Sequence, residues 1–342
     1  MTNCSRRVFL GTLGLTTGRF WSGHSAATGG RTKNPAKRTK SELVRRLSGV
    51  HNFLTTPFRS NYELDAVGIR GNVAHHARSA PDNMTIVVSG GLGELFTLGV
   101  AEHNQLVRAA VAGAQGRLPV VAGVGGGYSN TLKMARNAEA AGADAILIFA
   151  WPFACNNAEG AYQFLYDVAN SVCIGALLYP CAEGDFWPDV VQRLTKLPNV
   201  MGMKDASGDV QRGQTVTSVV GDEFLWIAEG EGHAEKALPV GARAYTSAVS
   251  TFVPDACRAF WLEGTTGNVD AMKTIHKERI APIAQLRSVK PGYGISGIKV
   301  GLEVLERAGG PVRPPGMQVE PEDRKEIAAI VRKHAEQPDD TC

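Results

Sequence analysis

From residue 49 onward, short apolar runs alternate with longer stretches in which apolar residues recur every three or four positions. Each short run is rich in Val, Ile, Leu or Ala and is followed by a Gly, Pro, Asn or Asp turn, which is typical of buried strands. The predicted strands lie at 50–55, 84–89, 119–124, 144–150, 173–179, 199–204, 224–229 and 243–249. The stretches between them predict amphipathic helices, among them 100–114, 129–141, 157–171 and 185–197.

Eight strand-then-helix units fit a (β/α)8 barrel, a closed parallel sheet of about 250 residues with its helices on the outside. A doubly wound open sheet is the competing architecture, but the near-regular repetition favours closure. Further helices are predicted after the eighth strand, at 268–287, 295–308 and 321–335. We therefore expect an α/β fold with a TIM barrel at 49–265 and a C-terminal helical extension at 266–342.

The first 30 residues are expected to lie outside the barrel. Ser5-Arg6-Arg7-Val8-Phe9-Leu10 places paired arginines before a mildly apolar run, and Ser25-Ala26-Ala27 supplies the small residues of a cleavage site. This pattern predicts a twin-arginine-type export signal and a periplasmic or otherwise exported protein. The alternative is a disordered basic tail on a cytoplasmic protein. The apolar run is too short to span a bilayer, so no stable membrane anchor is expected.

Residues 31–48 are rich in Lys and Arg and predict a solvated basic linker. The stretch lacks interleaved aromatic residues, and the formal net charge of the whole chain is only +3, so no nucleic-acid partner is expected. The 6 cysteines show neither a C-x-x-C pair nor zinc spacing. Cys173 and Cys257 are interpreted as small core residues.

Unusual chemistry appears where three of the predicted strands end. Strand six ends in Lys204, strand five in Tyr179, and strand two in the loop Gly90–Glu94. Catalytic groups of such barrels lie on the loops that follow the strands. Burial at a strand end lowers the pKa of a lysine and frees its amine to attack a carbonyl, so Lys204 is a candidate Schiff-base nucleophile and Tyr179 a candidate proton shuttle. The structural alternatives are a lysine paired with a neighbouring aspartate and a tyrosine that only packs.

The glycine loop and strand eight supply candidate binding groups. Backbone N–H groups at Gly90, Gly91, Leu92 and Gly93 could hold a substrate carboxylate, although three glycines can also simply form a tight turn. Ser247 and Ser250 could bind substrate hydroxyls or could be small residues that let the barrel close. Glu94 is interpreted as a structural acceptor for backbone N–H groups and not as the base.

Together these motifs resemble the dihydrodipicolinate synthase / N-acetylneuraminate lyase family. The resemblance extends from about His51 to the C-terminal helices. Its parts are Thr56-Pro57-Phe58, Gly90-Gly91-Leu92-Gly93-Glu94, Leu177-Leu178-Tyr179 and Met203-Lys204-Asp205-Ala206-Ser207-Gly208-Asp209. The C-terminal half is most similar to the 5-dehydro-4-deoxyglucarate dehydratase branch, in segments such as Tyr245-Thr246-Ser247-Ala248-Val249 and Gly310-Pro311-Val312-Arg313-Pro314-Pro315.

The resemblance implies a Schiff-base lyase of the dehydratase, decarboxylase or aldolase type that acts on a 2-oxo sugar acid with a pyruvate-like head. It implies a homo-oligomer, a tetramer or dimer. Neither a metal nor an organic cofactor is expected, because the histidines are scattered and the loop at 123–128 lacks the third glycine of a dinucleotide fingerprint. The alternatives are condensation with pyruvate, as in dihydrodipicolinate synthase, and an exported barrel that binds a sugar acid without turnover.

Four departures from the synthase pattern argue against dihydrodipicolinate synthesis. Gly91 and Leu92 replace hydroxyl residues of the loop, and Phe153-Ala154 replaces a relay tyrosine. Pro180 stands where an asparagine is typical, and the arginine expected shortly after Tyr179 is missing. The acidic stretch at 183–185 would repel a second carboxylate. Lys290, Lys299 and Arg243 are candidate replacement cations.

Overall fold

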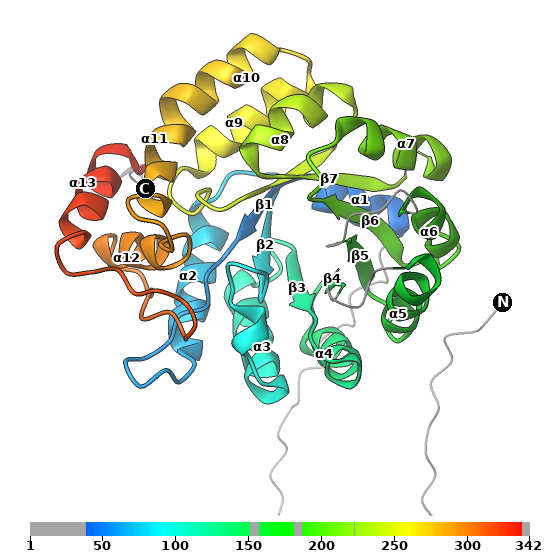
Figure 1. The fold of residues 1–342 in the computed structure, drawn as a ribbon, viewed down its shortest axis with the longest axis horizontal. Coiled ribbons are helices and arrows are strands. Elements are labelled where there is room, and N and C mark those ends of the chain that lie inside the picture. The colour runs from blue at the N-terminus through cyan, green and yellow to red at the C-terminus, as the bar shows by residue number, and fades with distance from the viewer. Residues whose placement is uncertain (1–38, 151–156, 181–186, 222, 337–342) are drawn as a thin grey trace, which may run out of the picture. The chain divides into compact units, whose positions relative to one another are not determined.

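The barrel predicted from the sequence is confirmed (Figure 1). The computed structural model describes residues 39–150, 157–180, 187–221 and 223–336. The strands form one closed sheet in which every neighbouring pair is parallel, including the closing pair of first and eighth strands. They are β1 (Gly49–Phe53), β2 (Met84–Val88), β3 (Val120–Val124), β4 (Ala145–Phe149), β5 (Gly175–Tyr179), β6 (Val200–Asp205), β7 (Leu225–Glu229) and β8 (Ala244–Ser247).

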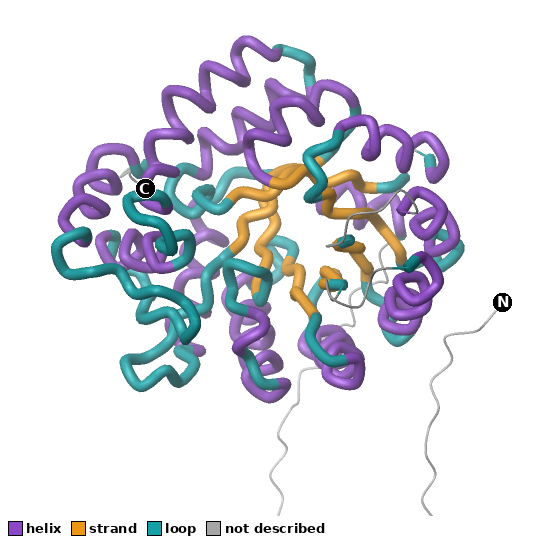
Figure 2. The backbone as a smooth tube through the Cα atoms, viewed as in Figure 1, coloured by secondary structure: helices purple, strands orange, loops and turns teal. Residues whose placement is uncertain are grey.

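Helices surround the strands on the outside of the barrel, as Figure 2 shows. They are α2 (Ala66–Ser79), α3 (Val100–Ala114), α4 (Tyr128–Ala141), α5 (Ala158–Asn170), α6 (Trp187–Leu194), α7 (Val210–Val220), α8 (Gly230–Ala237) and α9 (Pro254–Thr265). Short 3₁₀ turns lie at Leu95–Thr97 and Leu238–Val240. Because helices cover the outer face and side chains fill the inner one, the strands are buried along nearly their whole length.

The basic-linker prediction is wrong for residues 40–47, which form helix α1 (Lys40–Leu47). Thr39 begins this helix with a capping box to Glu42, and Leu43, Val44 and Leu47 are buried on one face. Leu43 lies beside Gly175 at the start of β5. The interpretation from composition failed because the charged positions lie on the exposed face of an amphipathic helix.

The C-terminal extension consists of several helices and forms one compact unit with the barrel. It contains α10 (Val269–Ile275), a π-helical segment (His276–Ile280), α11 (Ala281–Ala284), a 3₁₀ turn (Gln285–Arg287), α12 (Ser296–Val304) and α13 (Arg324–His334). The single helix predicted at 268–287 is interrupted because Pro282 has no N–H to donate and its ring crowds the preceding turn. Within the described ranges, none of the helices is both long and apolar enough to cross a membrane.

Candidate active site

A cavity of about 250 Å³ lies at the carboxyl ends of the strands, where the ends of β1, β4, β5, β6, β7 and β8 meet the loop after β2. Its walls bring together residues that are far apart in sequence. They are Phe53, Gly91, Leu92, Phe149, Tyr179, Lys204, Glu229, Gly230, Glu231, Thr246, Ser247, Ala248 and Arg287. The structure therefore places Lys204, Tyr179, the glycine loop and Ser247 around one space, as strand-end chemistry in a barrel predicts.

Lys204 lies near the end of β6 with only 4% of its surface exposed. Gly202, two residues earlier, permits this placement, because a Cβ there would come within 2.3 Å of the carbonyl oxygen of Leu225 on β7. Lys204 Nζ lies 2.8 Å from Oε1 of Glu229, which ends β7. The two neighbouring aspartates have partners of their own: Asp205 accepts hydrogen bonds from Ser207, and Asp209 caps α7.

Two opposing effects act on the Lys204 amine. Burial disfavours the charged ammonium, whereas a carboxylate at 2.8 Å favours it. The Glu229 side chain, in contrast, is 44% exposed. The pair thus places a carboxylate in direct contact with a shielded amine.

Tyr179 presents the face of its ring to the lysine. Lys204 Nζ lies 3.8 Å from the ring centroid, a cation–π geometry. Phe149 packs edge-on against the same ring, with the centroids 4.9 Å apart, and so holds its orientation. The face of the ring therefore covers the amine.

The glycine loop is shaped by close backbone contacts. Ser89 and Glu94, at its two ends, adopt left-handed backbone conformations with φ of 50° and 54°, a kind of strain that occurs at functional sites. Gly90 packs against Phe53, where a Cβ would lie 2.8 Å from the ring. Gly91 and Leu92 line the cavity, whereas Gly90 and Gly93 lie behind its wall. Gly90 and Gly93 thus shape the loop, and their contact with substrate stays a prediction.

Glu94 has the structural role expected of it, but its partners come from the distant C-terminal extension. Its Oε1 lies 2.5 Å from Nζ of the buried Lys299, and its Oε2 accepts a hydrogen bond from the backbone N–H of Arg313 at 2.8 Å. Burial lowers the pKa of Lys299, and the Glu94 carboxylate opposes this shift. The ion pair ties the glycine loop to α12.

The two serines at the end of β8 have different surroundings. Ser247 lines the cavity, and its Oγ accepts hydrogen bonds from the backbone N–H groups of Val249 and Ser250. Ser250 is fully buried outside the lining, and its Oγ has no hydrogen-bond partner among the described residues. Of the two serines, Ser247 alone is among the residues that line this cavity, and the substrate contacts of both stay predictions.

Sequence reasoning missed three charged residues of the lining: Glu229, Glu231 and Arg287. Burial raises the pKa of the Glu231 carboxyl, while a hydrogen bond from Ser247 acts in the opposite direction. Arg287 reaches the cavity from the C-terminal extension, and its Nε donates to the carbonyl of Gly294 at 3.1 Å. The acidic pair Glu229-Gly230-Glu231 after a strand was a signal that could have been used.

The candidate replacement cations lie elsewhere. Lys299 pairs with Glu94, Lys290 pairs with Glu320, and Arg243 precedes β8 at the opposite end of that strand. Phe153-Ala154 and the acidic stretch 183–185 fall outside the described residues. Among the described residues there is no cluster of three His, Cys, Asp or Glu side chains placed to hold a metal ion.

Comparison with known proteins agrees with the resemblance read from the motifs. A model of the dihydrodipicolinate synthetase family matches residues 46–334. Curated relatives named probable 5-dehydro-4-deoxyglucarate dehydratase include one from Bradyrhizobium diazoefficiens, 32% identical over 303 residues, and one from Rhizobium rhizogenes, 34% identical over 288 residues. The alignments cover 87% and 83% of this chain and 96% and 94% of the relatives.

Solved structures with the same fold include two dihydrodipicolinate synthases. The Bacillus anthracis protein has a TM-score of 0.75 at 23% identity, covering 84% of this chain and 98% of its own. The Aquifex aeolicus protein has a TM-score of 0.76 at 21% identity, covering 85% and 100%. These identities establish the fold alone, whereas the family model and the curated relatives establish descent. The chain belongs to the dihydrodipicolinate synthetase family.

Proposed function

We propose that this enzyme is a Schiff-base lyase that removes water from a 2-oxo, keto-deoxy sugar acid. The kinship with curated dehydratases supports lyase chemistry. The observation that carries the proposal is the buried Lys204, which faces a cavity at the strand ends in direct contact with Glu229 and Tyr179.

The first step of the proposed reaction is imine formation. Glu229 takes a proton from the Lys204 ammonium, and the neutral amine attacks the 2-oxo carbon of the substrate. The carbonyl oxygen becomes a hydroxyl and leaves as water, with a proton from Tyr179. The protonated imine that remains withdraws electrons from the adjacent carbon.

The second step is elimination from the imine. Tyr179, left as a phenolate by the first step, takes the proton from C3 and gives an enamine without a free carbanion, and the enamine electrons expel the hydroxyl at C4. Glu231 can supply the proton that turns this hydroxyl into water, because burial raises the pKa of its carboxyl and so favours the protonated form. Water then hydrolyses the imine and restores Lys204.

Charged groups of the lining support an acidic substrate. Backbone N–H groups at Gly91 and Leu92 are suited to the carboxylate beside the 2-oxo group. Arg287 is the one guanidinium among the described lining residues and is suited to a carboxylate or hydroxyl at the far end of the sugar. It takes the place of the arginine that the sequence lacks after Tyr179.

Leu92 argues against synthase-like condensation, because an apolar side chain lines the cavity where the synthase pattern has a hydroxyl. A barrel that only binds a sugar acid would not need a buried amine beside a carboxylate base. A direct assay of turnover distinguishes the three functions. The lyase would dehydrate a keto-deoxy sugar acid, a synthase would condense pyruvate with a second substrate, and a binding protein would turn over neither.

Replacing Lys204 by alanine tests the proposal. We expect turnover of keto-deoxy sugar acids to be abolished while circular dichroism and the melting temperature show an intact barrel. The matched control is Lys196→Ala, which removes an exposed lysine just before β6 and should leave turnover unchanged. Turnover near wild type in Lys204→Ala would refute the mechanism.

We also propose that the enzyme is exported and forms a homo-oligomer. The paired Arg6 and Arg7 support export. The prediction that Cys173 is a core residue is wrong, because its side chain is exposed. Cys173 is disulfide-bonded, which also supports export, since disulfides persist in oxidising compartments. Cell fractionation of wild type and of the Arg6→Lys, Arg7→Lys double variant tests export, and retention of both in the cytoplasm would contradict it. Light scattering on the purified enzyme tests the tetramer or dimer that the family resemblance implies.

A further inference from the structure

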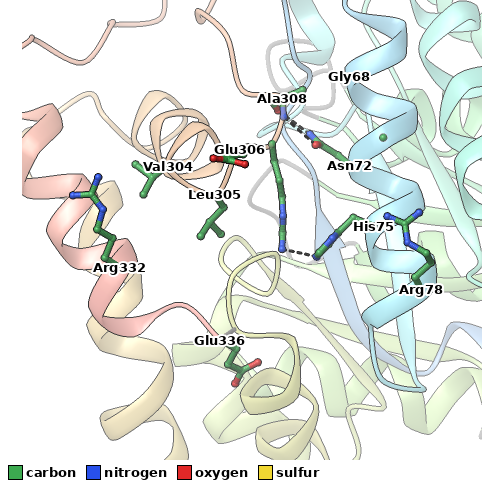
Figure 3. Close-up of a pocket in the computed structure, with 12 residues that line it drawn as sticks. Gly68, Asn72, His75, Arg78, Val304, Leu305, Glu306, Ala308, Arg332 and Glu336 are labelled. Carbon is green, nitrogen blue, oxygen red and sulfur yellow. Dashed lines mark hydrogen bonds between the residues drawn. The ribbon is translucent and has the colours of Figure 1, made fainter. Parts of the chain in front are cut away.

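A groove of about 710 Å³ lies between α2 and the end of the C-terminal extension (Figure 3). Asn72, His75 and Arg78 project from α2 on one side, and Arg332 projects from α13 on the other. The segment after α12 forms the floor and is held to α2 because Asn72 Nδ2 donates to the carbonyl of Ala308 at 2.7 Å. This groove shares no lining residue with the cavity around Lys204.

Arg307 is a half-buried cation in this groove without a carboxylate partner among the described residues. Its Nη1 donates to the carbonyl of Thr251 at 2.9 Å, and its Nη2 contacts Nε2 of His75. Burial lowers the pKa of the guanidinium, and no acidic group offsets the shift. A desolvated charge normally has a counter-ion, so the environment of Arg307 is incomplete.

Two more guanidinium groups face the same space. Arg78 and Arg332 are exposed, and neither forms an ion pair within the part of the chain that the structure describes. His75 lies between Arg78 and Arg307 and stays neutral at physiological pH, because burial and these two arginines lower its pKa to about 4. Three cations therefore surround the groove while the histidine adds hydrogen bonding and no charge.

The acidic residues of the groove do not balance this charge. Glu336 Oε1 is engaged by Arg279 Nη2 and the Ala256 backbone N–H, and its Oε2 accepts from the Asp255 backbone N–H. Glu306 is exposed and forms no ion pair with a described residue. Among the described lining residues, Glu306 is thus the one carboxylate without an ion pair, set against three arginines.

We propose that this groove is a binding site for a small oxyanion carrying two or more negative charges, a dicarboxylate or a phosphate group. Guanidinium groups match both in geometry, since their forked N–H groups can bind two oxygens at once. Arg307 supplies the desolvated contact, and Arg78 and Arg332 add positive charge from the two walls of the groove. The open space beside Gly71, where an added Cβ would meet nothing within 4 Å, leaves room for it.

Calorimetric titration of the full-length enzyme tests the site, with inorganic phosphate in one arm and succinate in the other, at constant ionic strength. Arg78→Gln and Arg332→Gln remove exposed side chains and should leave the fold intact. We expect each to weaken binding severalfold, because each substitution removes one positive charge from the groove. Arg70→Gln is the matched control, because Arg70 is also exposed on α2 but lies outside the groove.

Lys204→Ala separates this site from the lyase cavity. Binding that persists in Lys204→Ala and falls in the groove variants supports the groove even if the lyase mechanism fails. The arm with the tighter binding identifies the ligand class. No measurable binding of either probe, or equal binding by wild type, Arg78→Gln and Arg332→Gln, would overturn the proposal.

Discussion

At the scale of single residues, the central feature is the contact between Lys204 and Glu229. The carboxylate favours the ammonium form of a lysine that must lose its proton before it can attack a ketone. The same carboxylate can take that proton. The contact between the two side chains is open to a direct test.

Glu229→Gln removes the negative charge and keeps the shape of the side chain. The amine should then become neutral at lower pH, so the midpoint of covalent capture of pyruvate should fall by about one pH unit or more. Turnover should also fall, because the proton acceptor is lost. Borohydride trapping across a pH series measures the midpoint, and an unchanged midpoint would show that Glu229 does not control the lysine.

Tyr179→Phe keeps the ring over the Lys204 amine and removes only the hydroxyl. If the hydroxyl moves protons, kcat should fall about 10²-fold or more while KM changes little. Tyr128→Phe, which alters an exposed tyrosine outside the cavity, is the control. Equal activity of Tyr179→Phe and wild type would leave the ring with a packing role alone.

Sequence reasoning identified the residues whose chemistry depends on their own strand and missed those that depend on a neighbour. Lys204 and Tyr179 end strands whose apolar runs are plain in the sequence. Glu229 contacts Lys204 only because the parallel register places the end of β7 beside that lysine. Arg287 enters the cavity from a turn in the extension, and strand pattern alone does not predict where such a turn packs.

At the scale of elements, the contact between the glycine loop and α12 rests on a buried ion pair. Glu94→Gln removes one charge and leaves Lys299 buried without its partner. Breaking such a pair should lower the free energy of unfolding by about 3–5 kcal/mol. Urea unfolding measures the change.

Arg324→Gln is the matched control for Glu94→Gln. It breaks an ion pair with Glu303 in which both side chains are largely exposed, so the free energy of unfolding should change by about 1 kcal/mol or less. Similar losses in the two variants would contradict a special role for the Glu94–Lys299 pair.

Strand positions were predictable because each buried strand is a short apolar run between turns, and the ends agree with the prediction within two residues. Helix α1 was missed because many of its residues are charged and only the spacing of Leu43, Val44 and Leu47 reveals the buried face. The π-helical segment before Pro282 was missed because the apolar periodicity continues through it.

At the scale of the whole molecule, buried histidines make stability depend on pH. Burial lowers the pKa of His51 to about 4 and that of His76 to about 3, against about 6.5 in the unfolded chain. Between these values the unfolded chain binds more protons than the folded one. Their contribution to stability is therefore complete above pH 6.5. It is lost progressively as the pH falls from 6.5 to the pKa values of the folded state, about 4 for His51 and about 3 for His76.

Urea unfolding at a series of pH values between 7 and about 4 measures this dependence. The free energy of unfolding should fall as the pH is lowered. His51→Gln, which removes one of the titrating groups, should show a shallower fall. The same slope in wild type and His51→Gln would contradict the assigned role of the histidine.

The most direct test of the account is covalent capture of a ketone by Lys204. The folded enzyme is incubated with pyruvate, reduced with borohydride and digested, and the peptide containing residue 204 is weighed by mass spectrometry. We expect this peptide to gain the mass of one reduced pyruvate adduct in wild type and in Lys196→Ala. An unmodified peptide from folded wild-type enzyme, or an adduct on another lysine, would contradict it.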